Sequence, residues 1–349
     1  MPRARWTRYL ILMALALGLL FLLMILAASL GASALTFRQS LALFWEKLSA
    51  VRVDLIRDLD PAYETIVFRV RWPRIILSVL GGASLAVVGA SYQSIFMNAL
   101  ADPHILGVSS GAAFGASLAM IFGFKSVGLG LTGIGFGAFL GGLMTIGLLF
   151  LMTPGEIKTE TSRILLAGIA LSSLFSALMS LLMLFNRDRI AGIFYWLMGS
   201  YSSATWDKGR FMSLVFFPLT LLLFFFAPEM NIMLSGDEEA TSLGVAANRM
   251  RWTIILIATL LVASTVSTSG VVGFVGLIVP HALRLLKIHD VKQLLPAAAV
   301  CGAIFTLLCD SFARLAIPPT ELPVGVITAF FGVPLFLSLL YRSGKGAQG

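Results

Sequence analysis

The sequence has few charged residues and few cysteines. Only 12% of its 349 residues are Asp, Glu, Lys or Arg, against roughly 25% in soluble domains, and 58% are apolar. This composition excludes an ordinary water-soluble globular protein. The only two cysteines, Cys301 and Cys309, lie eight residues apart in an apolar run, which excludes a disulfide scaffold or a cysteine-based zinc module. We interpret them as small packing residues.

The formal charge of +8 does not indicate a nucleic-acid-binding protein. Such a protein gathers its basic residues on one solvated face, whereas the Lys and Arg residues here are scattered between apolar runs. A protein embedded in membrane lipid, with basic residues at its span ends and in its loops, fits better. We therefore expect no nucleic-acid partner.

Long runs without Asp, Glu, Lys or Arg predict the membrane spans, because such a residue at mid-bilayer costs about 2.5 to 3.5 kcal/mol. Most runs have the roughly 20 residues that one helical span requires. The run 190–206 is rich in Ser and aromatic residues, so we expect an interfacial helix there. The run 252–283 contains Gly270, Gly273 and Gly276, which predicts a span, a turn near 268–273 and a second, shorter helix. The runs are 9–37, 75–101, 103–124, 126–155, 164–186, 190–206, 211–228, 252–283, 293–309 and 322–341.

The predicted fold is a compact all-α bundle of about ten transmembrane helices, forming one domain over residues 1–349. The start also resembles a secretory signal with Ala32-Ser33-Ala34 as its cleavage site, but its apolar stretch is longer than about 7 to 15 residues, which favours an uncleaved span. An even span number places both termini on one side, and we expect that side to be the cytoplasm. Basic residues then gather outside, within 31–74.

Two glycine series predict close helix packing. Gly107, Gly111 and Gly115 recur every four residues, and so do Gly133, Gly137 and Gly141. Glycine allows two backbones to approach closely in a bilayer, where packing drives helix association. These are small-xxx-small packing faces of a tight bundle.

The sequence lacks the residue patterns that are typical of ion-coupled carriers, serine hydrolases, metal enzymes and nucleotide-binding proteins. Every Asp and Glu lies at a predicted span end or in a loop, which disfavours an ion-coupled secondary carrier. The G-x-S-x-G match at 107–111 opens an apolar helix rather than a nucleophile elbow. His104, His281 and His289 have no metal-ligand spacing, and no P-loop is present. We predict no enzyme, no metal site and no cofactor, with any ATP and Mg²⁺ held by a separate ATPase.

Five segments in a fixed order resemble the permease family of ABC importers for vitamin B12, ferric siderophores and haem, the type II importers. One departure is Ala99, where the family usually has Pro. The segments are Arg69 to Ala112, Thr161 to Leu171, Leu234 to Val245, Gly270 to Leu286 and Asp310 to Arg342.

The resemblance implies a ten-span permease in a bacterial or archaeal inner membrane. Its partners would be a second copy of the chain, two ATP-binding cassette subunits and an extracytoplasmic solute-binding protein. The chain itself would not hydrolyse ATP.

The resemblance also assigns residues 234–245 as a cytoplasmic coupling helix that docks on the ATPase. Acids in its first turn suit the helix dipole and a closing glycine suits a helix end. A solvated loop is the alternative. The residues concerned are Gly236, Glu238, Ala240, Leu243 and Gly244.

By the same resemblance, Arg71, Arg74 and Arg314 would dock acidic residues of the binding protein, since guanidinium suits carboxylates. Snorkelling interface anchors are the alternative.

The same resemblance implies that the cytoplasmic gate is narrowed by Thr161, Ser162 and Gly168. The hydroxyl residues could instead simply begin a helix.

The residues that would line a central pathway between two copies of the chain are mostly apolar or small, and they include no ligand cluster for a bare ion. A wide, weakly binding pathway of this kind suits a bulky metal chelate. We favour a ferric siderophore, with haem and cobalamin as alternatives.

Overall fold

The computed structural model describes residues 3–30, 36–49, 60–126, 128, 130–153, 161–317 and 320–346. Within these ranges the regular elements are all helices, apart from two isolated β-bridges. The long apolar helices are α1 (Arg3–Ser29), α4 (Trp72–Ile95), α6 (Gly133–Met152), α7 (Thr161–Phe185), α9 (Trp206–Phe225), α12 (Ala247–Ser269) and α14 (Val291–Leu315). Three other apolar helices are α5 (Val108–Phe122), α13 (Val275–Leu285) and α15 (Val324–Gly346). The remaining elements are α2 (Phe37–Ser49), α3 (Pro61–Thr65), the π-helix η2 (Ile66–Arg71), the 3-10 helix η3 (Arg187–Arg189), α8 (Ile190–Leu197), α10 (Ala227–Met233) and α11 (Asp237–Ser242).

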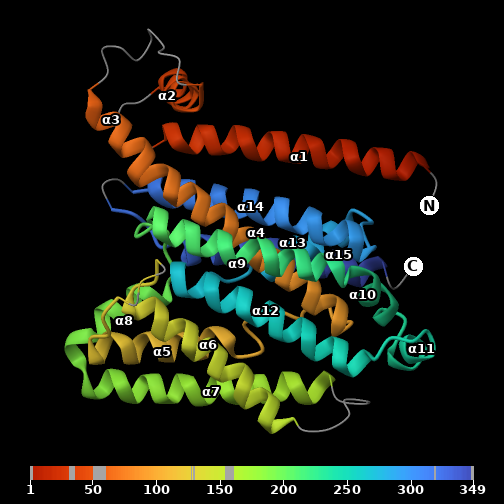
Figure 1. Ribbon diagram of the computed structural model, residues 1–349. Coiled ribbons are helices and arrows are strands. Elements are labelled where there is room, and N and C mark those ends of the chain that lie inside the picture. The colour runs from red at the N-terminus through yellow and green to blue at the C-terminus, as the bar shows by residue number, and fades with distance from the viewer. Residues whose placement is uncertain are drawn as a thin grey trace.

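The predicted all-α fold with about ten membrane-crossing helices is confirmed. Within the described ranges, seven helices are long and apolar enough to cross a membrane, and α5, α13 and the Val324–Ser338 part of α15 add three shorter apolar stretches. The run at 190–206 contributes only the short α8 and no span. The start of α1 and the end of α15 lie at the same end of the bundle as α11, whereas α2, α3 and α8 lie at the opposite end (Figure 1).

Helix α4 forms the centre of the bundle (Figure 1). It is mostly apolar and almost wholly buried, as expected of a helix surrounded by other helices. A Cβ on Gly82 would lie less than 3.0 Å from the carbonyl oxygen of Gly302 in α14, and a Cβ on Gly89 equally close to that of Gly276 in α13. The glycines of α4 thus allow its neighbours to pack directly on its backbone. Helices α1 and α7 lie on opposite outer sides.

The predicted break within residues 252–283 is confirmed. Helix α12 ends at Ser269, and α13 begins at Val275. Gly270 has a φ of 71°, and a Cβ there would lie less than 3.0 Å from the carbonyl oxygen of Trp196. Both the left-handed backbone and the close approach require glycine at this turn.

The glycine series are packing faces, as their spacing predicts, and two glycines of each series meet between α5 and α6. Gly115 of α5 packs on Gly137 of α6, and Gly111 packs on Gly141. In each pair the two backbones are too close for a Cβ atom to fit between them. The helices run in opposite directions, so the first series meets the second in reverse order. Close backbone packing of this kind holds membrane helices together without a hydrophobic driving force.

Candidate functional site

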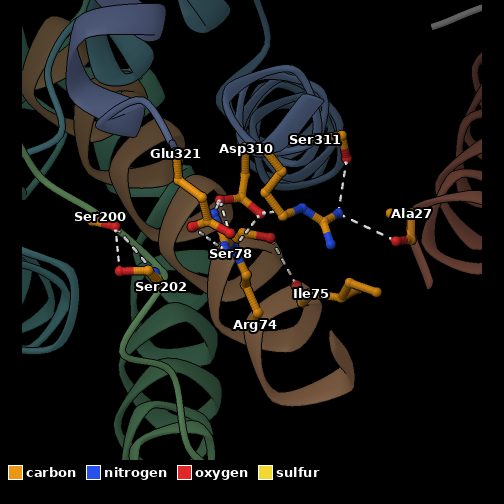
Figure 2. A network of polar contacts seen from close by, with 10 residues as sticks. Ala27, Arg74, Ile75, Ser78, Ser200, Ser202, Asp310, Ser311 and Glu321 are labelled. Atoms are coloured by element: carbon orange, nitrogen blue, oxygen red, sulfur yellow. Dashed lines mark hydrogen bonds and ion pairs between the residues drawn. The ribbon is translucent and has the colours of Figure 1, made fainter. Parts of the chain in front are cut away.

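A buried ion-pair network lies at the end of the bundle opposite α11. Arg74, in the first turn of α4, donates through Nε and Nη2 to the Asp310 carboxylate at 2.9 to 3.0 Å. Its Nη1 donates to Oε2 of Glu321 at 2.7 Å. Figure 2 shows the guanidinium between the two carboxylates, one from α14 and one from the segment before α15. The Asp310 side chain is 0% exposed, but Glu321 is 43% exposed, so only Glu321 meets the surface.

Arg71 and Arg314 hold the end of α1. Arg71 Nη1 donates to the carbonyl oxygens of Ala28 at 2.6 Å and Ser29 at 3.0 Å, and Arg314 Nη2 donates to that of Ala27 at 3.2 Å. These are last-turn carbonyls, which have no partner within their own helix. Cationic donors at this position also suit the helix dipole.

The three arginines predicted for docking are therefore brought together, but their side chains are buried and bound to groups of the same chain. Snorkelling does not describe them, because a snorkelling head group reaches water. Their role toward a binding protein stays a prediction. Any acidic partner that used Arg74 would have to approach it from the side of Glu321.

The segment predicted as a coupling helix contains the short helix α11. Gly236, with a φ of 112°, precedes it, and Gly244, with a φ of 85°, follows its last turn. Gly244 N donates to Thr241 O at 3.0 Å, and Val245 N donates to Ala240 O at 2.9 Å. These two hydrogen bonds form the Schellman motif, which needs a residue with a left-handed backbone at the position of Gly244.

The α11 segment has a buried side and an exposed side. Ala240 is fully buried, whereas Glu238, Leu243 and Gly244 are exposed or partly exposed. A solvated loop would bury nothing, so the segment is a packed helix.

Polar bonds also fix the helix that precedes α11. In α10, Asn231 donates through Nδ2 to Asp290 Oδ1 at 2.7 Å and accepts from the Val291 backbone N–H at 2.8 Å. Both partners belong to the N-terminus of α14. The α10–α11 pair is thus bound to a membrane-crossing helix rather than suspended between α9 and α12.

The predicted gate residues lie at the start of α7. Thr161 begins this helix, and the side chains of Thr161 and Ser162 lie outside the described residues. A Cβ on Gly168 would lie 2.6 Å from the Ile105 carbonyl oxygen and 2.8 Å from Leu106 Cα. Gly168 therefore allows α7 to pack on the segment that precedes α5. The gate role stays a prediction.

The segment 96–107 reaches about half the height of the bundle, a depth that its sequence does not indicate. A Cβ on Gly276 would lie 2.9 Å from Leu85 O, near the middle of α4, and 3.3 Å from Asp102 Oδ2. His104 Nε2 lies 3.2 Å from Val272 O. Non-helical backbone at this depth is tolerated when protein covers it, and Asp102 is buried.

Asp102 thus lies in a loop, as predicted, but deep in the bundle. An acid beside a broken helix is a feature of ion-coupled carriers. Here Asp102 Oδ1 accepts from the His104 backbone N–H at 2.8 Å, which makes it the first residue of a tight turn. Among the described residues, no three His, Cys, Asp or Glu side chains could together hold a metal ion.

The fold defines a multi-pass membrane protein. Residues 7–342 match the FecCD transport family, so the chain belongs to this family of ABC importer permeases. The molybdate import permease MolB of Haemophilus influenzae and the hemin transport permease HmuU of Yersinia pestis are each 36% identical to it. Both alignments cover 95% of this chain and 96% of the relative. An inward-facing metal-chelate type ABC transporter aligns with a TM-score of 0.81 and 34% identity over 95% of this chain and 99% of that one.

Family membership identifies the chain as the transmembrane permease and not the ATPase, and it implies an ATPase and a binding protein as partners. Permeases of this family bind no cofactor themselves. The family assignment that the five sequence segments indicated is confirmed.

Proposed function

We propose that the chain is the permease of an importer for a metal chelate, with a ferric siderophore as the favoured cargo. The observation that supports this most strongly is the similarity over 95% of the chain to a metal-chelate type transporter. Haem, the cargo in the name of the Yersinia relative, and cobalamin are the alternatives within the chelate class. Molybdate, the cargo in the name of the Haemophilus relative, is a small oxyanion and forms a separate class.

An uptake assay tests the cargo. The permease and its ATPase are reconstituted in vesicles with ATP inside, and the binding protein is added outside with a ferric hydroxamate, hemin, cyanocobalamin or molybdate. We expect ATP-dependent accumulation of the ferric hydroxamate. Vesicles with a hydrolysis-deficient ATPase serve as the control. Accumulation of molybdate alone, or of free manganese or zinc but no chelate, would contradict the proposal.

The assembly we propose contains two copies of this chain, two ATPase subunits and one binding protein. Helix α11 would face the cytoplasm and dock on the ATPase. Both termini would then be cytoplasmic, because the start of α1 and the end of α15 lie at the same end as α11 (Figure 1). Its Glu238 and the exposed Leu243 would contact the ATPase, and its glycines would set its bounds. Thr161 and Ser162 would lie at the inner gate, with Gly168 positioning α7 behind them.

The binding protein would dock at the opposite end, over Arg74 and its neighbours. Because Glu321 occupies the exposed side of Arg74, we propose that a carboxylate of the binding protein displaces Glu321 there. Arg71 and Arg314 would contribute by holding α1 in place beside this surface.

Glu321→Gln should therefore bind the solute-binding protein several-fold more tightly, because a neutral amide competes less well for Arg74. Asp207→Asn is the matched control, since it removes one exposed acid at the same end without contact to Arg74. Surface plasmon resonance on the permease in nanodiscs would measure both affinities. Equal gains for the two variants would mean that only net charge matters, and a weaker Glu321→Gln complex would contradict the displacement.

A further inference from the structure

Arg251 connects three helices at the α11 end of the bundle. It lies in the second turn of α12 and is 0% exposed, the largest side chain in the described core with so little exposure. Its Nη2 donates to Oδ1 of Asp237, the first residue of α11, at 2.7 Å. Its Nε donates to the carbonyl oxygen of Ile95, the last residue of α4, at 3.2 Å. One side chain thus bonds α11 to the end of α4.

The buried guanidinium of Arg251 is not explained by a contribution to stability alone. Burying a guanidinium costs several kcal/mol before its partners compensate, and Nη1 of Arg251 has no hydrogen-bond partner among the described residues. An apolar side chain of similar size would fill the space without that cost. The gain is directional, because a planar guanidinium holds two acceptors at fixed angles.

The same end of α4 is held a second time. Arg284 of α13 donates to Gln93 Oε1 and, at 3.1 Å, to Ser94 Oγ. Gln93 in turn donates to Leu277 O of α13 at 3.2 Å. The last turn of α4 therefore cannot shift without α12 and α13, and α11 is bonded to it through Arg251.

The other end of α4 carries Arg74 and its two carboxylates (Figure 2). Between the two ends lie 24 residues of uninterrupted α-helix, about 36 Å long. A packed, buried helix of this length moves as one body, because interiors are dense and resist compression. A displacement of its last turn would thus reach Arg74.

We infer that Arg251 is the positioning residue that transmits displacement of α11 to α4, and that α4 carries it to the Arg74–Asp310–Glu321 network. This inference rests on the proposed docking of α11 on the ATPase. It assigns Arg251 no contact with nucleotide or cargo.

The test follows nucleotide-driven change at the far end of α4. The full importer in nanodiscs carries Ile317→Cys, an exposed position between Asp310 and Glu321 in the sequence, and maleimide labelling is timed with and without ATP and vanadate. A background without Cys301 and Cys309 limits labelling of the permease to this site. We expect ATP to change the labelling rate several-fold in the parent protein and not in Arg251→Met, while both complexes hydrolyse ATP.

Arg249→Met is the matched control, since Arg249 is exposed on the same turn of α12 and should keep the nucleotide response. Asp237→Ala removes the acceptor of the same bond from its partly exposed side and should lose the response too, which covers a failure of Arg251→Met to fold. A nucleotide response that persists in Asp237→Ala or Arg251→Met would overturn the inference, as would its absence in the parent.

Gly244→Arg separates this inference from the proposed function. It adds a bulky charged side chain at an exposed position with a φ of 85° and should prevent the ATPase from assembling. If the ATPase still assembles on Gly244→Arg, the proposed docking of α11 fails. If the ATPase fails to assemble on Gly244→Arg but assembles on Arg251→Met, and Arg251→Met shows no nucleotide response, the docking of α11 and the role of Arg251 are both supported.

Discussion

Asp310→Asn is expected to destabilise the permease by about 3 to 5 kcal/mol, the cost of breaking a buried ion pair from one side. Asp310 accepts from two nitrogens of Arg74 and lies 3.7 Å from Nε of Arg314. The amide keeps the size of the carboxylate but removes its charge. The buried guanidinium groups of Arg74 and Arg314 would then lose the carboxylate that they share.

Thermal unfolding in detergent, followed by size-exclusion fluorescence, would measure the loss. Asp207→Asn is the control, because Asp207 and Arg210 form an exposed pair worth less than about 1 kcal/mol. Glu321→Gln should fall between them, since Glu321 binds Arg74 but is partly exposed. A melting temperature of Asp310→Asn equal to that of Asp207→Asn would mean that the network contributes little.

The spans could be predicted from the sequence because bilayer insertion depends on composition alone. A charge-free run of about 20 residues has one stable structure in lipid, a helix. The turn at Gly270 and the bounds of α11 at Gly236 and Gly244 could be predicted for a similar reason, since left-handed backbone strongly favours glycine. These are local properties.

The partners of the arginines could not be predicted in this way. Arg74 and Asp310 are 236 positions apart, and nothing local marks them as a pair. The three arginines predicted for docking do lie close together, but their burial within the chain could not be predicted. Arg251 was marked only by its place directly before a charge-free run, and its link to Asp237 and Ile95 depends on how three helices meet.

The depth of Asp102 shows the same limit. Its position between two apolar runs is typical of a surface loop. The structure instead places the segment 96–107 against Gly276 and Gly168, since glycine leaves space for its side chains at the first position and for its backbone at the second. The depth of a loop depends on the helices around it, which the sequence specifies only through contacts far apart in the chain.

Gly141→Ala in α6 is expected to separate α5 from α6 and destabilise the protein, at the upper end of about 1 to 3 kcal/mol for overpacking. The added Cβ would lie less than 3.0 Å from the backbone carbonyl oxygen of Gly111, where real Cβ atoms are essentially never found. A backbone atom cannot rotate away as a side chain can. The helices must therefore move apart, which also weakens the neighbouring contact between Gly115 and Gly137.

Gly147→Ala is the matched control on the same helix, because a Cβ atom added there would meet no other atom within 4 Å. There the same substitution should be neutral, or stabilising by up to about 1 kcal/mol, since alanine is the better helix former. Thermal unfolding of both variants in the same detergent would compare them. The two effects should have opposite signs, and a Gly141→Ala protein as stable as the Gly147→Ala protein would show that the α5–α6 contact is looser than the structure indicates.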